Sequence, residues 1–403
     1  MAIQSSLGTE TIVPSSTNET IDAQKDLAML DASKLRINLA DRLKPVPTPE
    51  NVVFGKHMSD HMLVVTYDPS SGWSEPEIKP YGPLLLDPTS SCFHYSTSLF
   101  EGMKAYSGPD GESRLFRPEL NMARMVRSAE RVALPPFDPN ELLKLIKRLV
   151  QIESRWIPQE SGYSLYIRPT IIGTRPYIGM GASDYATLFV VCCPAGLYFH
   201  RGAKMLSLMT LGAHVRAWPG GTGGHKISAN YAATFLPQQV AAQRGYDQVL
   251  WLLGDRITEA GAMNFFVVRK RSDGDLDLIT APLDGTVLPG VTRDSVLSLA
   301  GAHGHGITLP NLPPSLKIHV QERTFTTSDL SQWAEDGTLI EAFSAGTAVV
   351  IVSIGRIGLE GETDIILPKQ ESGMGPVAEA MCDKITAIQE GREQWSGWSV
   401  LCE

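Results

Sequence analysis

Several features that would point to a membrane protein, a secreted protein or a nucleic-acid-binding protein are missing from this sequence of 403 residues. No apolar run reaches the roughly 18 residues that a membrane-spanning helix requires. The first residues lack the basic and then apolar order of a secretory signal. Basic residues do not dominate, because 35 Lys and Arg stand against 44 Asp and Glu, a formal net charge of −9. A small-molecule substrate is therefore expected rather than a nucleic acid or a membrane.

Cysteine is scarce, and no metal-type spacing is present. The chain has five cysteines, of which Cys192 and Cys193 are adjacent and would point to opposite faces of a strand. We expect reduced thiols. His303 and His305, in GAHGHG, lack a third ligand, so a glycine-rich helix exit is the better interpretation and no metal site is predicted.

The first 23 residues are rich in Ser and Thr, contain Glu10 and Glu19, and have no arginine. This composition predicts a flexible arm over residues 1–30. Since a mitochondrial transit peptide would be rich in arginine and poor in acids, the cytoplasm is favoured, with the mitochondrion as the alternative.

The length predicts two domains. Helices and strands are mixed without a regular βαβ repeat, which favours an α+β fold over a doubly wound parallel sheet. We expect a small domain over residues 31–193, an interdomain loop over 194–204 and a large domain over 205–403. Expected helices are at residues 118–134, 138–156, from about 229, 292–300 and 377–390, and expected strands at 61–68, 164–172, 186–193, 248–253 and 264–269.

The helix expected from residue 138 has the strongest local start signal. Asp138 precedes Pro139, and Glu141 follows at the spacing of a capping box. We expect Asp138 to cap the first turn and Glu141 to reach back to it.

A glycine-rich turn over residues 220–224 precedes His225 and Lys226. A phosphate-binding Walker A loop would need Gly-Lys-Ser/Thr in sequence, whereas His225 separates Gly224 from Lys226 and Ile227 follows. That interpretation fails. An amine nucleophile near neutral pH has to be desolvated or placed near other cations. Taken alone, Lys226 would more often be a solvated lysine beside a loop.

Longer motifs overturn that expectation. The segment HKISANYAATFLPQQVAAQRGYDQVLWL, followed by ITEAGAMNFFVV, resembles the signature of the branched-chain amino acid aminotransferases of the eukaryotic type, which belong to the class IV aminotransferases. HYSTSLFEGMKAY, LFRPELNMARM, SLYIRPTIIG, VLPGVTRDS and FSAGTAVV extend the resemblance from about Phe54 to the C-terminus. The resemblance implies PLP fold type IV, with two α/β domains joined by a loop. It also implies the cofactor pyridoxal 5'-phosphate (PLP) and a homodimer with shared active sites.

The resemblance assigns the contacts of the cofactor ring. Lys226 matches the lysine that forms the Schiff base, and Tyr231 matches the tyrosine that contacts the phenolic oxygen. Glu259 matches the acid that faces the pyridine nitrogen, where a carboxylate keeps the nitrogen protonated so that the ring can accept electrons.

The phosphate contacts also follow from the resemblance. Arg124 matches the phosphate arginine, although helical geometry alone would place it with Arg127 and Arg131 on a face that is usually solvated. Backbone N–H groups at a helix start form an anion site. The other cofactor contacts that we expect are Leu288, Val291, Thr292 and Thr347.

Branched side chains need a dry pocket, and the α-carboxylate needs separate polar recognition. Arg168 would admit the second carboxylate of 2-oxoglutarate, and the backbone N–H groups of Thr347 and Ala348 match the family's α-carboxylate site. The expected reaction is a ping-pong transamination of Leu, Ile and Val with 2-oxoglutarate, giving 2-oxo acids and glutamate. The positions that match the family's substrate contacts are Phe54, Tyr95, Phe100, Tyr166, Arg168, Tyr198, Ala262, Thr347 and Ala348. Of these, Tyr95 is expected to be contributed by the partner subunit.

Three features depart from the family pattern. Ala262 stands where Glu-x-Gly-Thr would place a threonine, Val349 and Val352 replace the redox Cys-x-x-Cys of mammalian members, and the role of His225 is open. Ala262 motivates the alternative of a secondary-metabolism aminotransferase with a shifted substrate. The weaker alternatives are a lyase or D-amino acid transaminase of the same fold and a non-catalytic PLP-binding protein.

Overall fold

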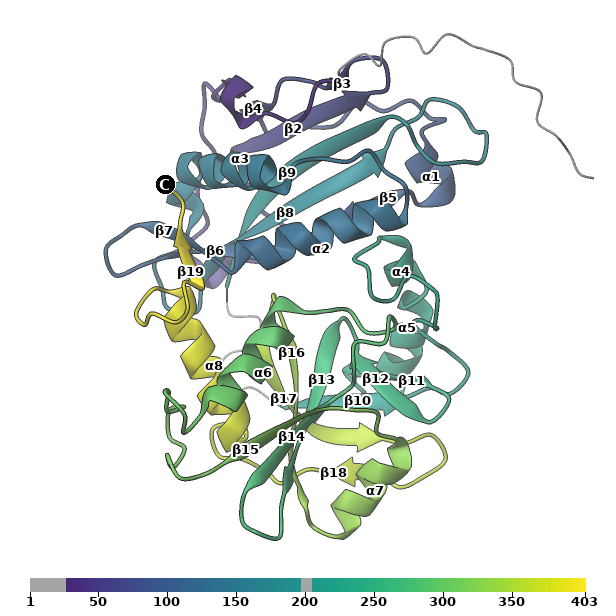
Figure 1. The fold of residues 1–403 in the computed structure, drawn as a ribbon, viewed down its shortest axis with the longest axis vertical. Coiled ribbons are helices and arrows are strands. Elements are labelled where there is room, and N and C mark those ends of the chain that lie inside the picture. The colour runs from purple at the N-terminus through teal and green to yellow at the C-terminus, as the bar shows by residue number, and fades with distance from the viewer. Residues whose placement is uncertain (1–26, 197–204) are drawn as a thin grey trace, which may run out of the picture.

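The computed structural model describes residues 27–196 and 205–403, which form two β-sheets with helices packed around them (Figure 1). The first sheet has ten strands in the order β1-β4-β2-β9-β8-β6-β7-β19, with β3 beside β2 and β5 beside β8. The second has nine strands in the order β12-β11-β10-β17-β16-β13-β14-β15, with β18 beside β17. The predicted α+β class is confirmed, and a doubly wound parallel sheet is absent from the described residues.

The first sheet is mainly antiparallel, and β8 and β9 pair along their whole length from Ser164↔Ala195 to Gly173↔Ala186. Helices α2 and α3 cover it with apolar side chains, among them Met125 and Leu145, both fully buried. Its strands are β1 (Arg36–Ile37), β2 (His61–Asp68), β3 (Gly72–Trp73), β4 (Glu77–Pro80), β5 (Ser98–Phe100), β6 (Met103–Ser107), β7 (Ser113–Phe116), β8 (Ser164–Gly173), β9 (Ala186–Ala195) and β19 (Ser399–Leu401). Its helices are α1 (Ser91–Tyr95), α2 (Pro118–Arg131), α3 (Pro139–Ile152) and the 3-10 turns η1 (Ala32–Lys34), η2 (Pro49–Asn51) and η3 (Ser154–Trp156).

The second sheet is mixed, because β10 pairs in parallel with both β11 and β17 while β13 pairs antiparallel with β12, β14 and β16. Its strands are β10 (Leu206–Thr210), β11 (Gln248–Leu253), β12 (Arg256–Ala260), β13 (Met263–Lys270), β14 (Leu276–Thr280), β15 (Ile318–Glu322), β16 (Leu339–Gly346), β17 (Val350–Gly358) and β18 (Ile365–Ile366). The helices of this half are α4 (Ala229–Ala232), α5 (Phe235–Gln243), α6 (Val291–Ala302), α7 (Thr327–Glu335) and α8 (Pro376–Gln389).

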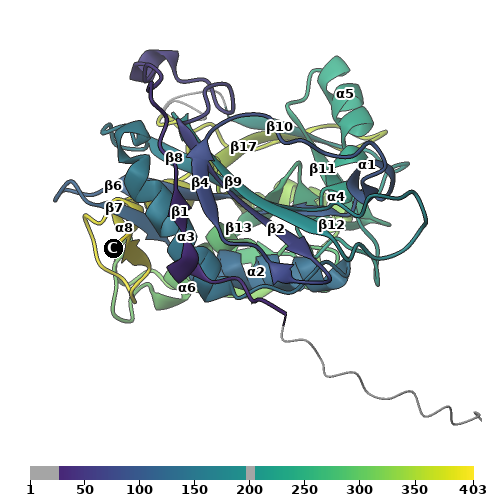
Figure 2. The same cartoon turned by 90° about the horizontal axis from the view of Figure 1, so that it is seen from above.

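The last strand crosses back from the second half of the chain to the first sheet. β19 pairs with β7 in the register Ser399↔Phe116 to Leu401↔Arg114, beyond α8 (Figures 1 and 2). The predicted boundary near residue 193 falls where the chain leaves the first sheet, although β9 continues through Ala195. The division into domains stays a prediction, and the crossing of β19 shows that the C-terminus fastens the two halves together.

The start of α3 confirms one half of the expected cap and corrects the other. The Asp138 side chain accepts hydrogen bonds from the N–H groups of Asn140 and Glu141. Glu141 does not reach back to the cap, because its carboxylate accepts from the N–H of Ala32 at 2.7 Å and from Lys144. It thereby ties the N-terminal segment to α3.

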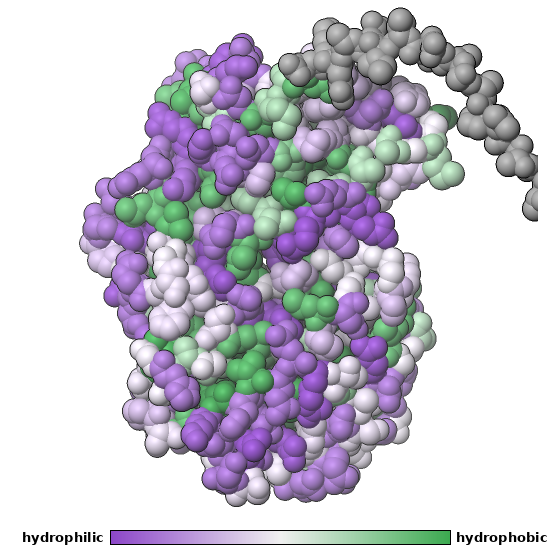
Figure 3. Space-filling model, in the orientation of Figure 1, coloured by the Kyte–Doolittle hydropathy of each residue, from purple (hydrophilic) through white to green (hydrophobic). Residues whose placement is uncertain are grey.

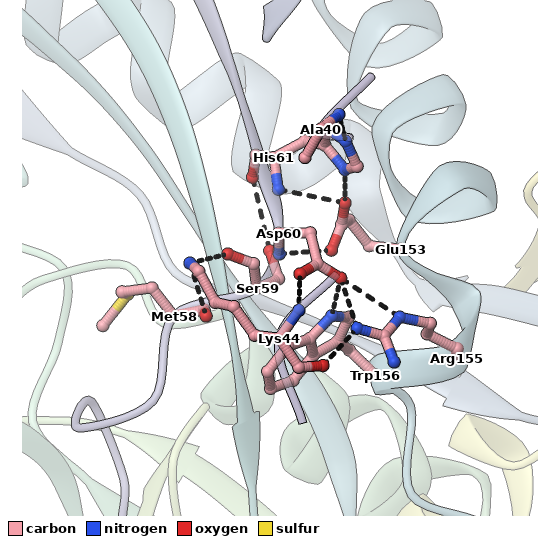
Figure 4. Close-up of polar contacts among 9 residues, drawn as sticks. All are labelled: Ala40, Lys44, Met58, Ser59, Asp60, His61, Glu153, Arg155 and Trp156. Atoms are coloured by element: carbon pink, nitrogen blue, oxygen red, sulfur yellow. Dashed lines mark hydrogen bonds and ion pairs between the residues drawn. The ribbon is translucent and has the colours of Figure 1, made fainter. Parts of the chain in front are cut away.

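A buried polar network joins β2 to the end of α3 (Figure 4). The Glu153 carboxylate contacts the His61 ring and accepts from the main-chain N–H of Asp60 at 2.9 Å. Asp60 in turn accepts from the Trp156 indole at 2.8 Å and from Arg155 at 2.6 Å. Both carboxylates are almost fully buried, so these bonds offset the cost of removing their charges from water.

On the face drawn in Figure 3, hydrophilic and hydrophobic side chains are interspersed. Within the described ranges, every helix is too short or too polar to cross a bilayer.

Candidate active site

Lys226 lies just before α4, and elements of the N-terminal half hold its main chain. The Phe100 N–H donates to the Lys226 carbonyl at 3.2 Å, and the Lys226 N–H donates to the Ser128 hydroxyl of α2 at 2.9 Å. The next residue, Ile227, forms an antiparallel bridge with Leu99 of β5. The candidate lysine is therefore placed where the two halves of the chain meet.

The Lys226 amine faces two aromatic rings. Its Nζ lies 3.2 Å from the Tyr231 hydroxyl and 5.0 Å from the centre of the Phe100 ring. The Phe100 and Tyr231 rings are themselves 5.0 Å apart. The lysine is half-buried rather than a solvated side chain beside a loop, and the structure brings it together with Tyr231.

Arg124 is only 3% exposed, so the expectation of a solvated face is wrong for this residue. Its Nε and Nη2 donate to the two carboxylate oxygens of Glu101 at 2.7 and 2.8 Å, and its Nη1 donates to the Pro289 carbonyl at 2.9 Å. Burial works to raise the pKa of Glu101, but attraction from Arg124 outweighs it and holds that pKa below its usual value. By contrast, Arg127 and Arg131 are exposed.

Glu259 lies at the end of β12 and is buried. Its Oε1 accepts from the Asn264 amide at 3.1 Å and from the Leu288 N–H at 3.4 Å. Its Oε2 forms an ion pair with Arg216 at 2.7 Å but has no partner in hydrogen-bonding geometry. Burial raises the pKa of Glu259 even though Arg216 opposes the shift, so the carboxylate is a stronger base than an exposed glutamate.

The N-terminus of α6 lies where the anion site was expected. The cap residue Gly290 has no side chain to satisfy the first-turn N–H groups, and Val291 and Thr292 are buried. Thr347, in the turn between β16 and β17, lines the same small cavity as Val291 and Thr292. The N–H groups of a helix start favour an anion, so the three residues are brought together as predicted.

A second cation, Lys104 of β6, lines that cavity and was not predicted. Its Nζ donates to the Ala348 carbonyl at 2.8 Å, which ties the first sheet to the turn of Thr347 and Ala348. Burial lowers the pKa of the Lys104 ammonium to about 8. The turn ends at Val350, a β-branched residue in the left-handed region at φ 61°, so strained backbone is held here by its contacts.

The predicted pocket walls lie in one row. The Phe54 and Tyr166 rings meet edge to face at 4.9 Å, and the Arg168 guanidinium lies 4.6 Å from the centre of the Phe100 ring. Arg168 also donates to the Tyr166 hydroxyl at 2.9 Å. Gly102 makes room for this row, because a Cβ at that position would overlap the Tyr166 hydroxyl.

Other predicted substrate residues lie apart from this row or cannot be placed. The Tyr95 hydroxyl donates to the Ile178 carbonyl at 2.5 Å, and the residue is 39% exposed. Ala262 is exposed at the tip of the hairpin between β12 and β13. Tyr198 lies outside the described residues.

Two of the histidines named above, His303 and His225, bury ring nitrogens. His303 is buried, and its ring lies 3.1 Å from both the Pro313 carbonyl oxygen and the Leu309 N–H, so it holds together the segment after α6. The Nδ1 of His225 is buried without a hydrogen-bond partner, and burial together with Arg131 and Arg127 lowers the pKa of this ring.

The side chains present fit PLP. Three groups of the site could each form a further hydrogen bond with this cofactor. They are the Glu259 Oε2, the first-turn N–H groups of α6, and the Arg124 guanidinium, whose Nη atoms each carry one further hydrogen. A pyridinium N–H would satisfy the first, and a phosphate would satisfy the others. The Lys226 amine lies beside the Tyr231 hydroxyl, where the cofactor aldehyde and phenolic oxygen would need them.

Several residues of the site were missed in the sequence. Glu101 and Lys104 lie within the HYSTSLFEGMKAY motif, and Ser128 follows Arg124 by one helical turn, so spacing could have suggested them. Arg216 has no such signal, since it meets Glu259 only through the fold.

A two-sheet α+β fold with a half-buried lysine beside a tyrosine, a buried acid and unsatisfied N–H groups at a helix start fits the class of PLP-dependent transferases. A family model described as amino-transferase class IV matches residues 98–357. The chain is 46% identical over 379 residues to "Branched-chain-amino-acid aminotransferase, cytosolic" of Saccharomyces cerevisiae, covering 93% of this chain and 98% of the relative. It is 45% identical over 379 residues to the mitochondrial enzyme of that yeast, covering 92% and 93%.

Solved structures agree in fold. A branched-chain aminotransferase from Thermoproteus uzoniensis with norvaline superposes with a TM-score of 0.66 at 24% identity, covering 85% of this chain and all of that one. The branched-chain amino acid aminotransferase from Thermobaculum terrenum in its PLP form gives 0.65 at 20% identity, covering 85% and 98%. The chain belongs to the branched-chain-amino-acid aminotransferase family of the class IV aminotransferases, with fold type IV and PLP as cofactor.

Proposed function

We propose that this protein transfers the amino group of Leu, Ile or Val to 2-oxoglutarate, giving branched 2-oxo acids and glutamate. The observation that carries the proposal is the Lys226 amine, 3.2 Å from the Tyr231 hydroxyl and beside the Phe100 ring. Its relatives of 42–46% identity carry the name branched-chain-amino-acid aminotransferase, and substrates of that class fit the row of aromatic side chains at the site.

Bound PLP supplies an aldehyde for the amino group and a ring that accepts electrons. Lys226 would take the proton that leaves the substrate Cα and give it to the carbon that carried the aldehyde, and it would move a proton the opposite way in the second half-reaction. The Tyr231 hydroxyl, which accepts from the Lys226 Nζ at 3.2 Å, would contact the phenolic oxygen of the ring, and Glu259 would hold a proton at the ring nitrogen. Arg124 and the start of α6 bind the phosphate, which fixes the orientation in which the Cα–H bond is broken.

The pocket has to accept an apolar side chain in one half-reaction and a carboxylate in the other. Phe54, Phe100 and Tyr166 provide apolar walls for the first. Arg168 lies against the Phe100 and Tyr166 rings, so a side-chain carboxylate can pair with it without leaving the pocket. The N–H groups of Thr347 and Ala348 are the proposed site of the α-carboxylate.

The test is a panel of Leu, Ile, Val, Phe and Met as donors to 2-oxoglutarate with purified holoenzyme. We expect the three branched donors to give the highest kcat/KM. Poor turnover with all three would reject the proposal in favour of a shifted substrate, an alternative that none of the relatives described above supports.

We also propose a homodimer with shared sites. The segments around α1 and Ile178 are linked by the Tyr95 hydrogen bond and by a bridge between Ser90 and Pro176. They expose large apolar side chains, Phe93 at 61%, Ile178 at 62% and Met180 at 89%, as an interface would. Light scattering after gel filtration should give twice the chain mass of 43.9 kDa.

Relatives named cytosolic and mitochondrial are about equally similar to this chain, so a location in the cytoplasm stays a proposal that rests on the composition of the N-terminal residues.

A further inference from the structure

We infer that Ser128 is a positioning residue for Lys226. The inference rests on the proposed role of Lys226 and adds a residue that does not touch the reacting atoms. Ser128 is fully buried on α2, and its hydroxyl accepts the main-chain N–H of Lys226 at 2.9 Å.

This hydrogen bond completes the fixation of the Lys226 main chain. The Lys226 carbonyl accepts from Phe100, and the Ser228 N–H donates to the Ser98 carbonyl at 3.0 Å. Both contacts come from β5 and hold the chain on the C-terminal side of the lysine Cα. Ser128 holds the N-terminal side, so the lysine leaves a peptide segment that is fastened on both flanks.

The segment before Lys226 needs such a fastening. Residues 220–224 contain four glycines, and Gly220 has a positive φ of 77°. From α4, the Asn230 amide donates to the carbonyls of Thr222 and His225 at 2.9 and 2.8 Å, so it holds the loop against that helix. Asn230 belongs to the same part of the chain, however, and cannot fix the loop relative to the first sheet. Two residues of α2 make that connection: Arg131 donates to the Gly220 carbonyl at 3.2 Å in an exposed bond at the far end of the loop, and Ser128 makes the buried bond at the lysine itself.

The position of Ser128 on α2 links it to the phosphate site. Asn121, Arg124 and Ser128 follow one another at spacings of three and four residues, so they lie on one face of the helix, and all three are buried. At 1.5 Å per residue, Arg124 and Ser128 are about 6 Å apart along the axis. One rigid helix therefore sets the separation between the proposed phosphate arginine and the main chain of the lysine.

The experiment compares Ser128→Ala, Ser128→Cys and the control Ser164→Ala in purified holoenzyme. Ser164 is also fully buried, but its hydroxyl has no hydrogen-bond partner, so its removal should change little. A thiol is a weak acceptor of nearly the same volume, so Ser128→Cys should lie between the wild type and Ser128→Ala. Steady-state kinetics with leucine and amide hydrogen exchange of residues 222–228 are the two readouts.

We expect kcat of Ser128→Ala to fall roughly tenfold to a hundredfold with KM nearly unchanged, because misplacement affects the chemical step. Exchange in residues 222–228 should become faster, while Ser164→Ala behaves like the wild type. An unchanged kcat, unchanged exchange, or an equal loss in Ser164→Ala overturns the inference. Lys226→Ala, assayed in parallel, separates the two claims: if it retains turnover, the proposed function of the lysine fails, whatever Ser128 does.

Discussion

Arg124 and Glu101 are joined by two hydrogen bonds in a fully buried pair, at 2.7 and 2.8 Å. The pair fixes the plane of the guanidinium, and the bond from Nη1 to Pro289 fixes its second edge. The hydrogens that remain on the two Nη atoms are thereby aimed before any phosphate arrives. Glu101 thus pre-organises the arginine that we propose for phosphate binding.

Replacing Glu101 by Ala should leave Arg124 as a buried charge without its partner. We expect a loss of about 3–5 kcal/mol in the free energy of unfolding of the apoprotein. Added PLP should recover part of this loss, since a phosphate offers the arginine a new partner. Urea denaturation with and without PLP measures both.

The matched control is Glu75→Ala, because Glu75 pairs with Arg36 at the surface, where both side chains are more than half exposed. Exposed pairs contribute about 0–1 kcal/mol. Equal losses in the two variants would contradict the role given to Glu101.

Local sequence signals predicted much of the fold. Asp138 caps α3 and the strand at His61–Asp68 has the expected bounds, because both depend on neighbouring residues. Glu141 was assigned the wrong partner, since the competing donor, Ala32, is 109 positions away. The crossing of β19 to β7 had no local signal either.

In the candidate site too, local sequence signals predicted some features, and contacts between distant elements determined the others. Helical periodicity grouped Arg124 with Arg127 and Arg131, and only the family motif selected Arg124. What buries Arg124 is Glu101 and the carbonyl of Pro289, which come from other elements. Periodicity describes one helix, whereas a buried charge depends on what the rest of the fold places against it.

The stability contributed by Lys104 should depend on pH. Burial lowers the pKa of Lys104 to about 8, below its usual value of 10.5. Between these pH values the unfolded chain binds a proton that the folded chain does not, so stability rises with pH in this window. Below pH 8 both states are protonated, and the full cost of burying the charge is present.

The variant Lys104→Met removes this titration. The free energy of unfolding of the variant minus that of the wild type should be largest below pH 8. Between pH 8 and 10 this difference should fall by up to about 1.4 kcal/mol per pH unit, because the wild type gains stability there. Urea unfolding at several pH values gives the difference directly. A stability difference that does not vary with pH would show that Lys104 does not titrate in this way.

Gly102→Ala should damage the pocket. The added Cβ overlaps the Tyr166 hydroxyl, so the ring has to move and its hydrogen bond with Arg168 is broken. We expect KM for leucine and for 2-oxoglutarate to rise roughly tenfold or more, on the scale of about 1–3 kcal/mol for a lost buried contact. Gly301→Ala, in α6 with open space around its Cα, is the control and should keep both KM values.

Ala262→Thr should restore the hydroxyl that the family pattern carries at this position. One additional hydrogen bond is worth about 0.5–1.5 kcal/mol, so KM for the amino acid should fall roughly twofold to tenfold. The donor panel repeated on this variant measures the change. If all donors keep their KM, the hydroxyl has no place at this substrate site, and Ala262 carries no specificity.

The central claim is that Lys226 bonds to PLP. Borohydride reduction of the yellow holoenzyme, followed by mass spectrometry of its peptides, locates the cofactor covalently. We predict the phosphopyridoxyl group on the peptide that contains Lys226, and no such label in Lys226→Ala. Label on Lys104, the other lysine lining the site, with Lys226 unmodified, would contradict the account.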